Sequence, residues 1–215
     1  MSRVLLVDDH LSFRQPLAFM LSREPTITVI GQAGTVAEAR QYFLQVDIAL
    51  VDLNLPDGEG EGLIRALKSV NPGAKALVLT ASDSDTAMAQ AVEAGAEGVL
   101  HKSRPIEEVI AAIGRLDAGE HLISPMETIA LLRLVAHQRE QDRTARAAID
   151  RLTRREREVL QALSGGLHDR EIAERLHVST ETIRTHMVNI LHKLGVDSRM
   201  EALLFAMRHR LVTID

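Results

Sequence analysis

The chain has 215 residues, which suits one large domain or two small ones, and its 46% hydrophobic and 26% charged content is typical of a soluble globular protein. It has no cysteine, which excludes disulfides, thiolate zinc sites and cysteine nucleophiles, and its 2% aromatic content argues against stacking on single-stranded nucleic acid. Neither a signal peptide nor an apolar stretch long enough to span a bilayer is evident, so we expect a cytoplasmic protein.

The net charge of −5 is unevenly distributed. Residues 1–120 carry 10 basic and 17 acidic side chains, and residues 121–150 carry 4 of each. Residues 151–215 carry 11 basic and 9 acidic side chains. An acidic part followed by a mildly basic part predicts two domains with different partners.

Short apolar runs alternate with stretches of helical periodicity in the first part of the chain. Such runs are typical of buried parallel strands that helices connect. Five β-α units in succession predict an α/β domain over residues 1–120, with a doubly wound, parallel, five-stranded, flavodoxin-like sheet. The expected strands are residues 4–7, 27–31, 48–52, 76–80 and 98–101, and the expected helices are residues 11–22, 36–44, 61–70, 85–94 and 106–118.

Polar side chains end or follow four of these runs: Asp8 and Asp9, Asp52, Thr80 and Lys102. Because the carboxyl ends of parallel strands meet at one edge of a sheet, we expect these five side chains to converge. Clustered carboxylates repel one another unless a cation compensates, and Mg²⁺ prefers oxygen ligands. The pattern therefore predicts a site for Mg²⁺ and a phosphoryl group, with Asp52 as the nucleophile.

A separate segment begins at Ser124, where Ser-Pro-Met-Glu combines an N-cap, a proline at the first helical position and a capping glutamate. Apolar residues recur at helical spacing as far as Val135, before a polar run at residues 137–144. We expect residues 121–150 to form a partly helical linker, whose helix fades in the polar run.

Residues 151–215 show no strand pattern and are expected to form a second, all-α domain. Capping boxes predict helices that begin after Thr153 and after Ser198. Between them, a short helix over residues 170–176 and a longer one over residues 179–194 are separated by a tight turn. This is the pattern of a helix-turn-helix, whose second helix enters the major groove of DNA.

The longer helix has two distinct faces. Ile183, Met187, Ile190 and Leu194 recur at the spacing of an inward face. On the opposite face, Arg184 can reach guanine and Val188 a thymine methyl group, whereas Arg170, Thr180 and Lys193 suit backbone phosphates. The expected DNA-binding residues are Arg170, Thr180, Glu181, Arg184, Thr185, Val188, His192 and Lys193.

The motifs of residues 1–120 resemble the CheY-like receiver domain of two-component response regulators. The resemblance implies that Asp52 accepts a phosphoryl group from a sensor histidine kinase and that Thr80 and Lys102 contact that group. It also implies a Mg²⁺ site made by Asp9, Asp52 and the backbone carbonyl of Asn54, with Asp8 helping through water. The matching strings are Leu6-Val7-Asp8-Asp9-His10, Asp52-Leu53-Asn54-Leu55-Pro56-Asp57-Gly58, Leu79-Thr80-Ala81 and Gly95-Ala96-Glu97-Gly98-Val99-Leu100-His101-Lys102.

One departure from the receiver pattern affects the expected switch. Val99 stands three residues before the lysine, where relatives carry Tyr or Phe, and is either a smaller version of the switch or a sign of weakened coupling. An enzyme of the haloacid dehalogenase type also uses an aspartyl nucleophile, but it needs a second aspartate where this chain has Asn54. Single aspartates at strand ends are usually turn caps, and it is the five residues in register that favour the phosphoryl site.

The motifs of the helical part resemble the LuxR-type helix-turn-helix, and the two resemblances together imply the NarL/FixJ class of transcriptional regulators. In this reading, phosphorylation controls homodimerisation and binding to operator half-sites in double-stranded DNA, and the chain is not an enzyme for an external substrate. Two alternatives stay open: a receiver uncoupled from a constitutive DNA-binding output, and a protein-interaction output without DNA affinity. The matching strings are Leu152-Thr153-Arg154-Arg155-Glu156-Arg157-Glu158-Val159-Leu160, Glu171-Ile172-Ala173, Val178-Ser179-Thr180-Glu181-Thr182-Ile183-Arg184-Thr185-His186, Lys193-Leu194-Gly195-Val196 and Ser198-Arg199.

Overall fold

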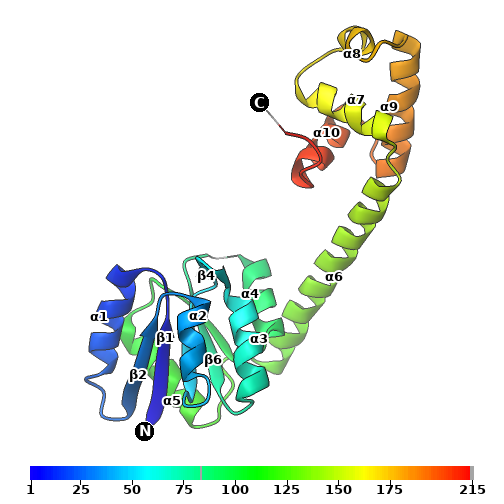
Figure 1. Cartoon of the computed structure of the whole chain (residues 1–215). Coiled ribbons are helices and arrows are strands. Elements are labelled where there is room, and N and C mark those ends of the chain that lie inside the picture. Colours follow the sequence, from blue (N-terminus) through cyan, green and yellow to red (C-terminus); the bar gives the residue numbers. More distant parts are fainter. Residues whose placement is uncertain (83, 214–215) are drawn as a thin grey trace. The chain divides into compact units, whose positions relative to one another are not determined.

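The computed structural model describes residues 1–82 and 84–213, and the chain forms two compact units, Met1–His137 and Gln138–Asp215 (Figure 1). Each unit has a hydrophobic core of its own. Over the described residues, no helix combines the length and the apolar character that crossing a membrane requires.

A five-stranded parallel sheet forms the centre of the first unit, which confirms the predicted α/β fold. Its strand order is β2-β1-β3-β6-β7, the order of a doubly wound flavodoxin-like sheet. The strand bounds agree with the expected ones to within two residues, the usual scatter of such assignments. The strands are β1 (Ser2–Val7), β2 (Ile27–Ala33), β3 (Ile48–Val51), β6 (Lys75–Thr80) and β7 (Gly98–His101).

Helices cover both faces of this sheet (Figure 1). Helices α1 and α5 pack over Val4 and Leu6, whereas α2, α3 and α4 pack over Leu5 and Val7. Because successive side chains of a strand point to opposite faces, a strand that is covered on both sides has to be apolar throughout. The helices are α1 (Leu11–Leu21), α2 (Val36–Ala39), α3 (Gly60–Val70), α4 (Asp85–Glu93) and α5 (Ile106–Asp117).

The order of the strands reverses at β1, which lies between β2 and β3. A crevice forms at such a point, outside the carboxyl ends of the strands. Asp8 follows β1 and Asp52 follows β3. The N–H of Asp52 donates to the carbonyl of Val7 over 2.8 Å, so the register of the two strands brings both aspartates to the crevice.

Two local features differ from the sequence-based expectation. The helix expected over residues 36–44 is α-helical only to Ala39 and continues as a 3-10 turn, η1 (Arg40–Tyr42). This tighter turn places the Tyr42 ring against Gly31, where a Cβ atom would lie only 2.5 Å from the ring. A short hairpin, β4 (Asn54–Leu55) and β5 (Gly58–Glu59), forms where only a turn was expected.

Helix α6 (Pro125–Asp150) corrects the expectation that the helix fades in the polar run. The segment from residue 137 to residue 148 contains neither glycine nor proline, and nine of its twelve residues are arginine, glutamine, glutamate or alanine. These residues have high intrinsic helix propensity, so polarity there marks a solvated helix and not a break. Glu127 caps the first turn of the helix as expected, since it accepts a hydrogen bond from the N–H of Ser124 over 2.9 Å.

The second unit contains a helix-turn-helix, as predicted. Helices α8 and α9 are joined by a turn in which His177 adopts a left-handed conformation, with φ of 53°. Ile183, Met187, Ile190 and Leu194 of α9 are buried in the core of this unit, as their spacing predicts. The helices are α7 (Arg154–Ser164), α8 (Asp169–Leu176), α9 (Thr180–Leu194) and α10 (Arg199–Arg208).

A buried ion pair ties α7 to α9. The Glu156 side chain is only 3% exposed, and its two carboxylate oxygens lie 2.8 and 2.7 Å from the Lys193 ammonium. Burial raises the pKa of the Glu156 carboxyl. Hydrogen bonds from Lys193 and Thr153 lower it by more, so that the pKa lies below its ordinary value. The sequence pattern predicts that Lys193 contacts DNA phosphates. In the structure its ammonium is paired with the Glu156 carboxylate.

Replacing Glu156 with glutamine is expected to lower the free energy of unfolding at pH 7 by about 2 kcal/mol, because it leaves the half-buried Lys193 ammonium without its carboxylate. Since folding lowers the pKa of Glu156, the ion pair contributes fully above the unfolded pKa of about 4.3 and is lost as the pH falls through the folded value. Urea unfolding followed by circular dichroism at pH 7 and in acid measures both effects. The control Glu158→Gln removes partly exposed ion pairs with Arg154 and Arg155 and should cost less than about 1 kcal/mol. A loss as large as that of Glu156→Gln would contradict this account.

Candidate functional site

Two buried carboxylates and one exposed carboxylate lie at the crevice of the first unit. Asp8 and Asp52 are buried, and Asp9 is exposed. Ligand atoms of Asp8, Asp9, His10 and Asp52 all lie within 4.8 Å of one another. The structure therefore brings together the three aspartates that the sequence analysis singled out.

The Lys102 side chain reaches this cluster from the end of β7. Its ammonium lies 2.7 Å from a carboxylate oxygen of Asp8 and 2.7 Å from one of Asp52. It also lies 5.2 Å from the centre of the Phe13 ring, within the range of a cation–π contact. Burial lowers the pKa of Lys102, but the interactions of its ammonium with the two aspartate carboxylates raise it by more, so that the pKa is above its ordinary value and the ammonium stays charged.

Thr80 is buried at the end of β6, beside β7. Its hydroxyl oxygen accepts a hydrogen bond from the N–H of Ser82 over 3.0 Å, and its carbonyl accepts one from the N–H of Lys102 over 2.7 Å. Val99 is partly buried on β7 and packs against the core on the side of α3 and α4. Asn54 is exposed in β4, and its N–H lies 3.4 Å from Asp52 Oδ1.

Two residues of the site were missed by the sequence analysis. The Nδ1 atom of His10 lies 2.6 Å from Asp9 Oδ1, and the His10 N–H donates to Asp8 Oδ1 over 2.9 Å. The guanidinium of Arg14 donates a hydrogen bond to the backbone carbonyl of Asp8, and a Cβ atom at Gly34 would lie 2.9 Å from it. No sequence signal marks Arg14, because its contact with a backbone carbonyl depends on the conformation of its side chain.

The chemistry of these donors fits a hard divalent cation. The cluster offers carboxylate oxygens at the mouth of the crevice, which is the ligand type that such cations take. Asp8 Oδ2 is buried and accepts no hydrogen bond of normal geometry from the described residues, although it lies within ion-pair distance of Lys102. A buried carboxylate oxygen in that state is suited to a cation or a bound water.

The exposed face of α9 is the one that its sequence pattern predicts. Glu181, Arg184, Thr185, Val188 and His192 are all exposed, opposite the buried face. Arg184 Nη1 lies 3.2 Å from Glu181 Oε2, and the Thr185 hydroxyl donates to the Glu181 carbonyl over 3.1 Å. On this exposed face Val188 is the apolar member among polar side chains.

The other expected DNA contacts have different surroundings. Arg170 is exposed on α8 and pairs with Glu174 over 3.1 Å, and Thr180 is half-buried at the start of α9. Asp169, which places a negative charge at the start of α8, forms an ion pair with Arg199 of α10. Its charge is therefore compensated within the unit.

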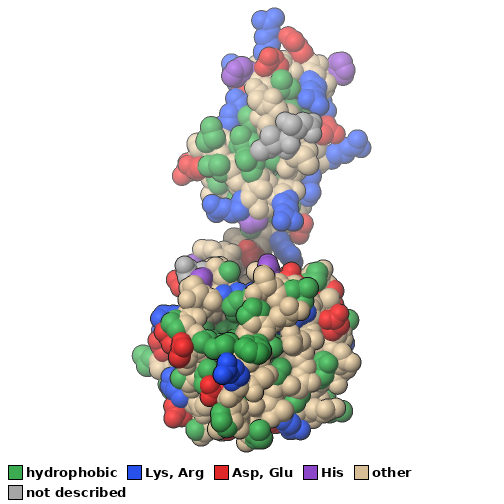
Figure 2. Space-filling view, turned by 90° about the vertical axis from the view of Figure 1, so that its left-hand side faces the viewer, with side chains coloured by type: hydrophobic (Ala, Val, Ile, Leu, Met, Phe, Trp, Pro, Cys, Tyr) green, Lys and Arg blue, Asp and Glu red, His purple; other side chains and the backbone are tan. Residues whose placement is uncertain are grey.

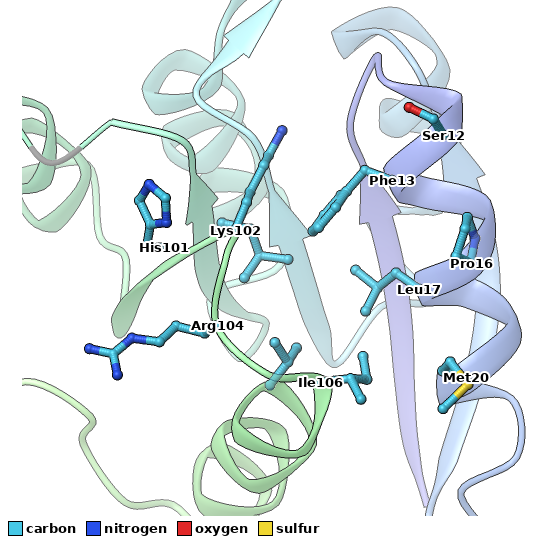
Figure 3. Close-up of a pocket in the computed structure, with 11 residues that line it drawn as sticks. Ser12, Phe13, Pro16, Leu17, Met20, His101, Lys102, Arg104 and Ile106 are labelled. Carbon is cyan, nitrogen blue, oxygen red and sulfur yellow. The ribbon is translucent and has the colours of Figure 1, made fainter.

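A pocket of about 190 Å³ opens between α1 and α5 (Figure 3). Phe13, Leu17 and Met20 of α1 face Ile106 of α5 across it, and Lys102 and Arg104 stand along its border. Phe19 and Met20 of α1 are exposed large hydrophobic residues. Figure 2 shows hydrophobic side chains gathered around a hollow on one face of this unit.

Comparisons with known proteins agree with these features. Residues 4–114 match the family described as response regulator receiver domain, and residues 150–206 match the bacterial regulatory proteins of the luxR family. The DNA-binding transcriptional activator DevR/DosR of Mycobacterium tuberculosis is 37% identical over 209 residues, which are 96% of this chain and 94% of that protein. Response regulator protein VraR of Staphylococcus aureus is 31% identical over 98% of both chains.

Solved structures give the same result. The response regulator ChrA of a heme-sensing two-component system is 34% identical, with a TM-score of 0.53 over 97% of this chain and 98% of that one. A receiver match and a luxR-family match in this order, together with relatives aligned over nearly the whole length, leave one conclusion. The chain belongs to the two-component response regulators that carry a LuxR-type DNA-binding output.

Proposed function

We propose that phosphorylation of Asp52 switches this response regulator, with residues 1–120 as the receiver domain, 121–150 as a linker and 151–215 as the DNA-binding domain. The observation that carries the proposal is the Lys102 ammonium, 2.7 Å from both Asp8 and Asp52. A positive charge at that point balances two buried carboxylates at rest. It is also in reach of a phosphoryl group on Asp52, whose charge it would neutralise.

The transfer is a displacement at phosphorus. A carboxylate oxygen of Asp52 forms the new P–O bond while the P–N bond of the kinase phosphohistidine breaks, and the electron pair of that bond returns to the imidazole. We assign the Mg²⁺ ligands to Asp8, Asp9, Asp52 and the backbone carbonyl of Asn54; when bound, the ion supplies neutralisation of the phosphoryl oxygens. Hydrolysis of the aspartyl-phosphate then resets the receiver, and no external substrate is turned over.

Three residues would respond to the phosphorylation of Asp52 and pass the change to the rest of the domain: Thr80, Lys102 and Val99. In our proposal the Thr80 hydroxyl gives up the hydrogen bond that it accepts from the Ser82 N–H and donates a hydrogen bond to a phosphoryl oxygen. Val99, on the neighbouring strand, would follow by repacking against the core, because it lacks the ring that an aromatic switch would rotate. A small shift in a packed core can move a bistable domain between two arrangements.

The face made by α1 and α5 is our candidate for pairing two receiver domains. It contains the apolar pocket and Met20, an exposed residue that lines it. Exposed apolar patches of this kind mark interaction sites on soluble proteins. Two copies related by a two-fold axis would each present the same patch to the other.

The substitution Met20→Glu is expected to keep the protein monomeric after activation, because it would bury a carboxylate in the apolar contact. Beryllofluoride with Mg²⁺ serves as the activating phosphoryl mimic, and light scattering measures the mass. The wild type should double its mass, and Met20→Glu should not. The matched control Met88→Glu, on an exposed methionine of α4, should behave as the wild type; loss of dimers in Met88→Glu alone would move the interface to α4.

The DNA-binding output can be tested with the same activator, by measuring the binding of DNA. The protein should bind a pool of random-sequence duplex DNA more tightly after beryllofluoride is added. Its affinity for DNA should fall steeply as the salt concentration rises, as phosphate neutralisation requires. The variant Asp52→Asn should show neither response. If the wild type binds DNA equally with and without beryllofluoride, the receiver is uncoupled from a constitutive output; if it binds no DNA at all, the output is an interaction module.

A further inference from the structure

An acidic side chain, Glu181, lies at the N-terminal end of the exposed face of α9. The side chain of Glu181 is 76% exposed, and its Oε2 atom lies 3.2 Å from Arg184 Nη1. Glu181 belongs to the first turn of the helix, after the Ser179 N-cap, where the helix dipole favours a carboxylate. A negative charge is unexpected on a surface that meets DNA, because it repels phosphates.

The helix geometry places Glu181 with the other exposed side chains. Glu181 and Arg184 are separated by about 4.5 Å along the axis at 1.5 Å per residue. This is close to one base-pair step of about 3.4 Å. Glu181 and Val188 lie about two turns apart and therefore point in nearly the same direction. In a helix that enters the major groove, residues near the N-terminal end contact base edges.

The chemistry of a carboxylate restricts what it can meet there. A carboxylate only accepts hydrogen bonds, so it is attracted to the amino group on cytosine N4 and repelled by the acceptors of guanine and thymine. Adenine suits it less well than cytosine, because the adenine amino group on N6 stands beside the acceptor N7. Arg184 has the opposite requirement, since its guanidinium only donates and pairs best with guanine O6 and N7. The ion pair between the two holds both groups on the same side of the helix before DNA binds.

We propose that Glu181 determines the base preference of this output domain, by accepting a hydrogen bond from cytosine N4 within one base-pair step of a guanine that Arg184 contacts. The inference rests on the proposed function of residues 151–215 in DNA binding, with α9 as the helix that enters the major groove. Glu181 thus lowers the affinity for DNA in general and favours half-sites that offer an amino group at this position. Its role is discrimination between sequences, and the phosphate contacts come from other residues.

Selection from a random-sequence duplex pool tests this proposal with the full chain, activated by beryllofluoride and Mg²⁺. The wild type should enrich sites with cytosine at one position per half-site, next to an enriched guanine. In Glu181→Gln that position should change to adenine by at least about five-fold, because an amide pairs with adenine N6 and N7. Glu181→Ala should lose the preference at that position, and Arg184→Ala should lose the neighbouring guanine.

The control variant is Glu174→Gln, which removes an equal charge from an exposed pair with Arg170 on α8. It should raise the affinity for all sequences alike and leave the selected bases unchanged. If Glu181→Gln and Glu181→Ala select the same base as the wild type, the inference is wrong while the proposed function stands. If the wild type selects no sequence at all, the proposed DNA-binding function fails, and the inference fails with it.

Discussion

Asp52→Asn is expected to reduce phosphoryl labelling of the protein by acetyl phosphate and Mg²⁺ to background. The substitution keeps the size of the side chain but replaces a charged nucleophilic oxygen with an amide, which cannot attack phosphorus effectively. Asp52 is buried at the end of β3, so a change without added volume should leave the sheet intact. Intact-mass spectrometry after incubation measures the labelled fraction directly.

The control for this experiment is Asp117→Asn, an exposed aspartate at the end of α5. This variant should be labelled as strongly as the wild type, because it lies at the amino-terminal side of the sheet, away from the crevice. Labelling that survives in Asp52→Asn would move the phosphoacceptor to another residue. Asp8 and Asp9 would then be the first positions to examine, since their carboxylates share the cluster.

Lys102→Met is expected to lower the free energy of unfolding by about 3 kcal/mol at neutral pH in the absence of Mg²⁺. The variant leaves two buried carboxylates close together without the ammonium that lies between them, and an unpaired buried charge is strongly destabilising. Mg²⁺ should restore more stability to the variant than it adds to the wild type, because a ligand that binds only the folded state stabilises it. Urea unfolding with and without Mg²⁺ measures both quantities.

The pH dependence of the same difference has a defined direction. Folding raises the pKa of Lys102, so its contribution to stability is complete below the unfolded pKa of about 10.4 and is lost as the pH rises through the higher folded value. The control is Lys75→Met, which removes a lysine whose ammonium donates to the Leu116 carbonyl and pairs with no carboxylate in the cluster. A Mg²⁺ response in Lys75→Met as large as in Lys102→Met would contradict the assigned role of Lys102.

Most of the fold could be predicted because its signals are local. A strand covered on both faces is a continuous apolar run, as in β1 and β3, and a helix of the second unit begins at a cap such as Ser179. The expected helix over residues 36–44 was only partly correct, because it continues after Ala39 as a 3-10 turn. The Tyr42 ring of that turn packs against Gly31 of β2, a contact that helical spacing does not reveal. The continuity of α6 was underestimated because polarity was given more weight than helix propensity.

The candidate site shows the same division. Asp8, Asp9 and Asp52 could be placed together from the sequence, because each follows a strand whose carboxyl end must meet the others. The arginine at position 14 could not be placed, because its bond to the Asp8 carbonyl depends on the side-chain conformation and on the absence of a Cβ atom at Gly34. His10 could not be distinguished from an ordinary surface histidine until its ring was found beside Asp9.

The sequence by itself determined the order of the elements, the strand ends that carry the acidic cluster and the exposed face of α9, because each depends on neighbours a few residues away. Only the tertiary structure decided which charged side chains form ion pairs with one another. Lys102 lies 50 residues from Asp52, and Lys193 lies 37 residues from Glu156, yet both ammonium groups are held by these carboxylates. The energy of an ion pair depends on the distance between the two charges and on their burial. Neither quantity can be predicted from the spacing of the residues along the chain.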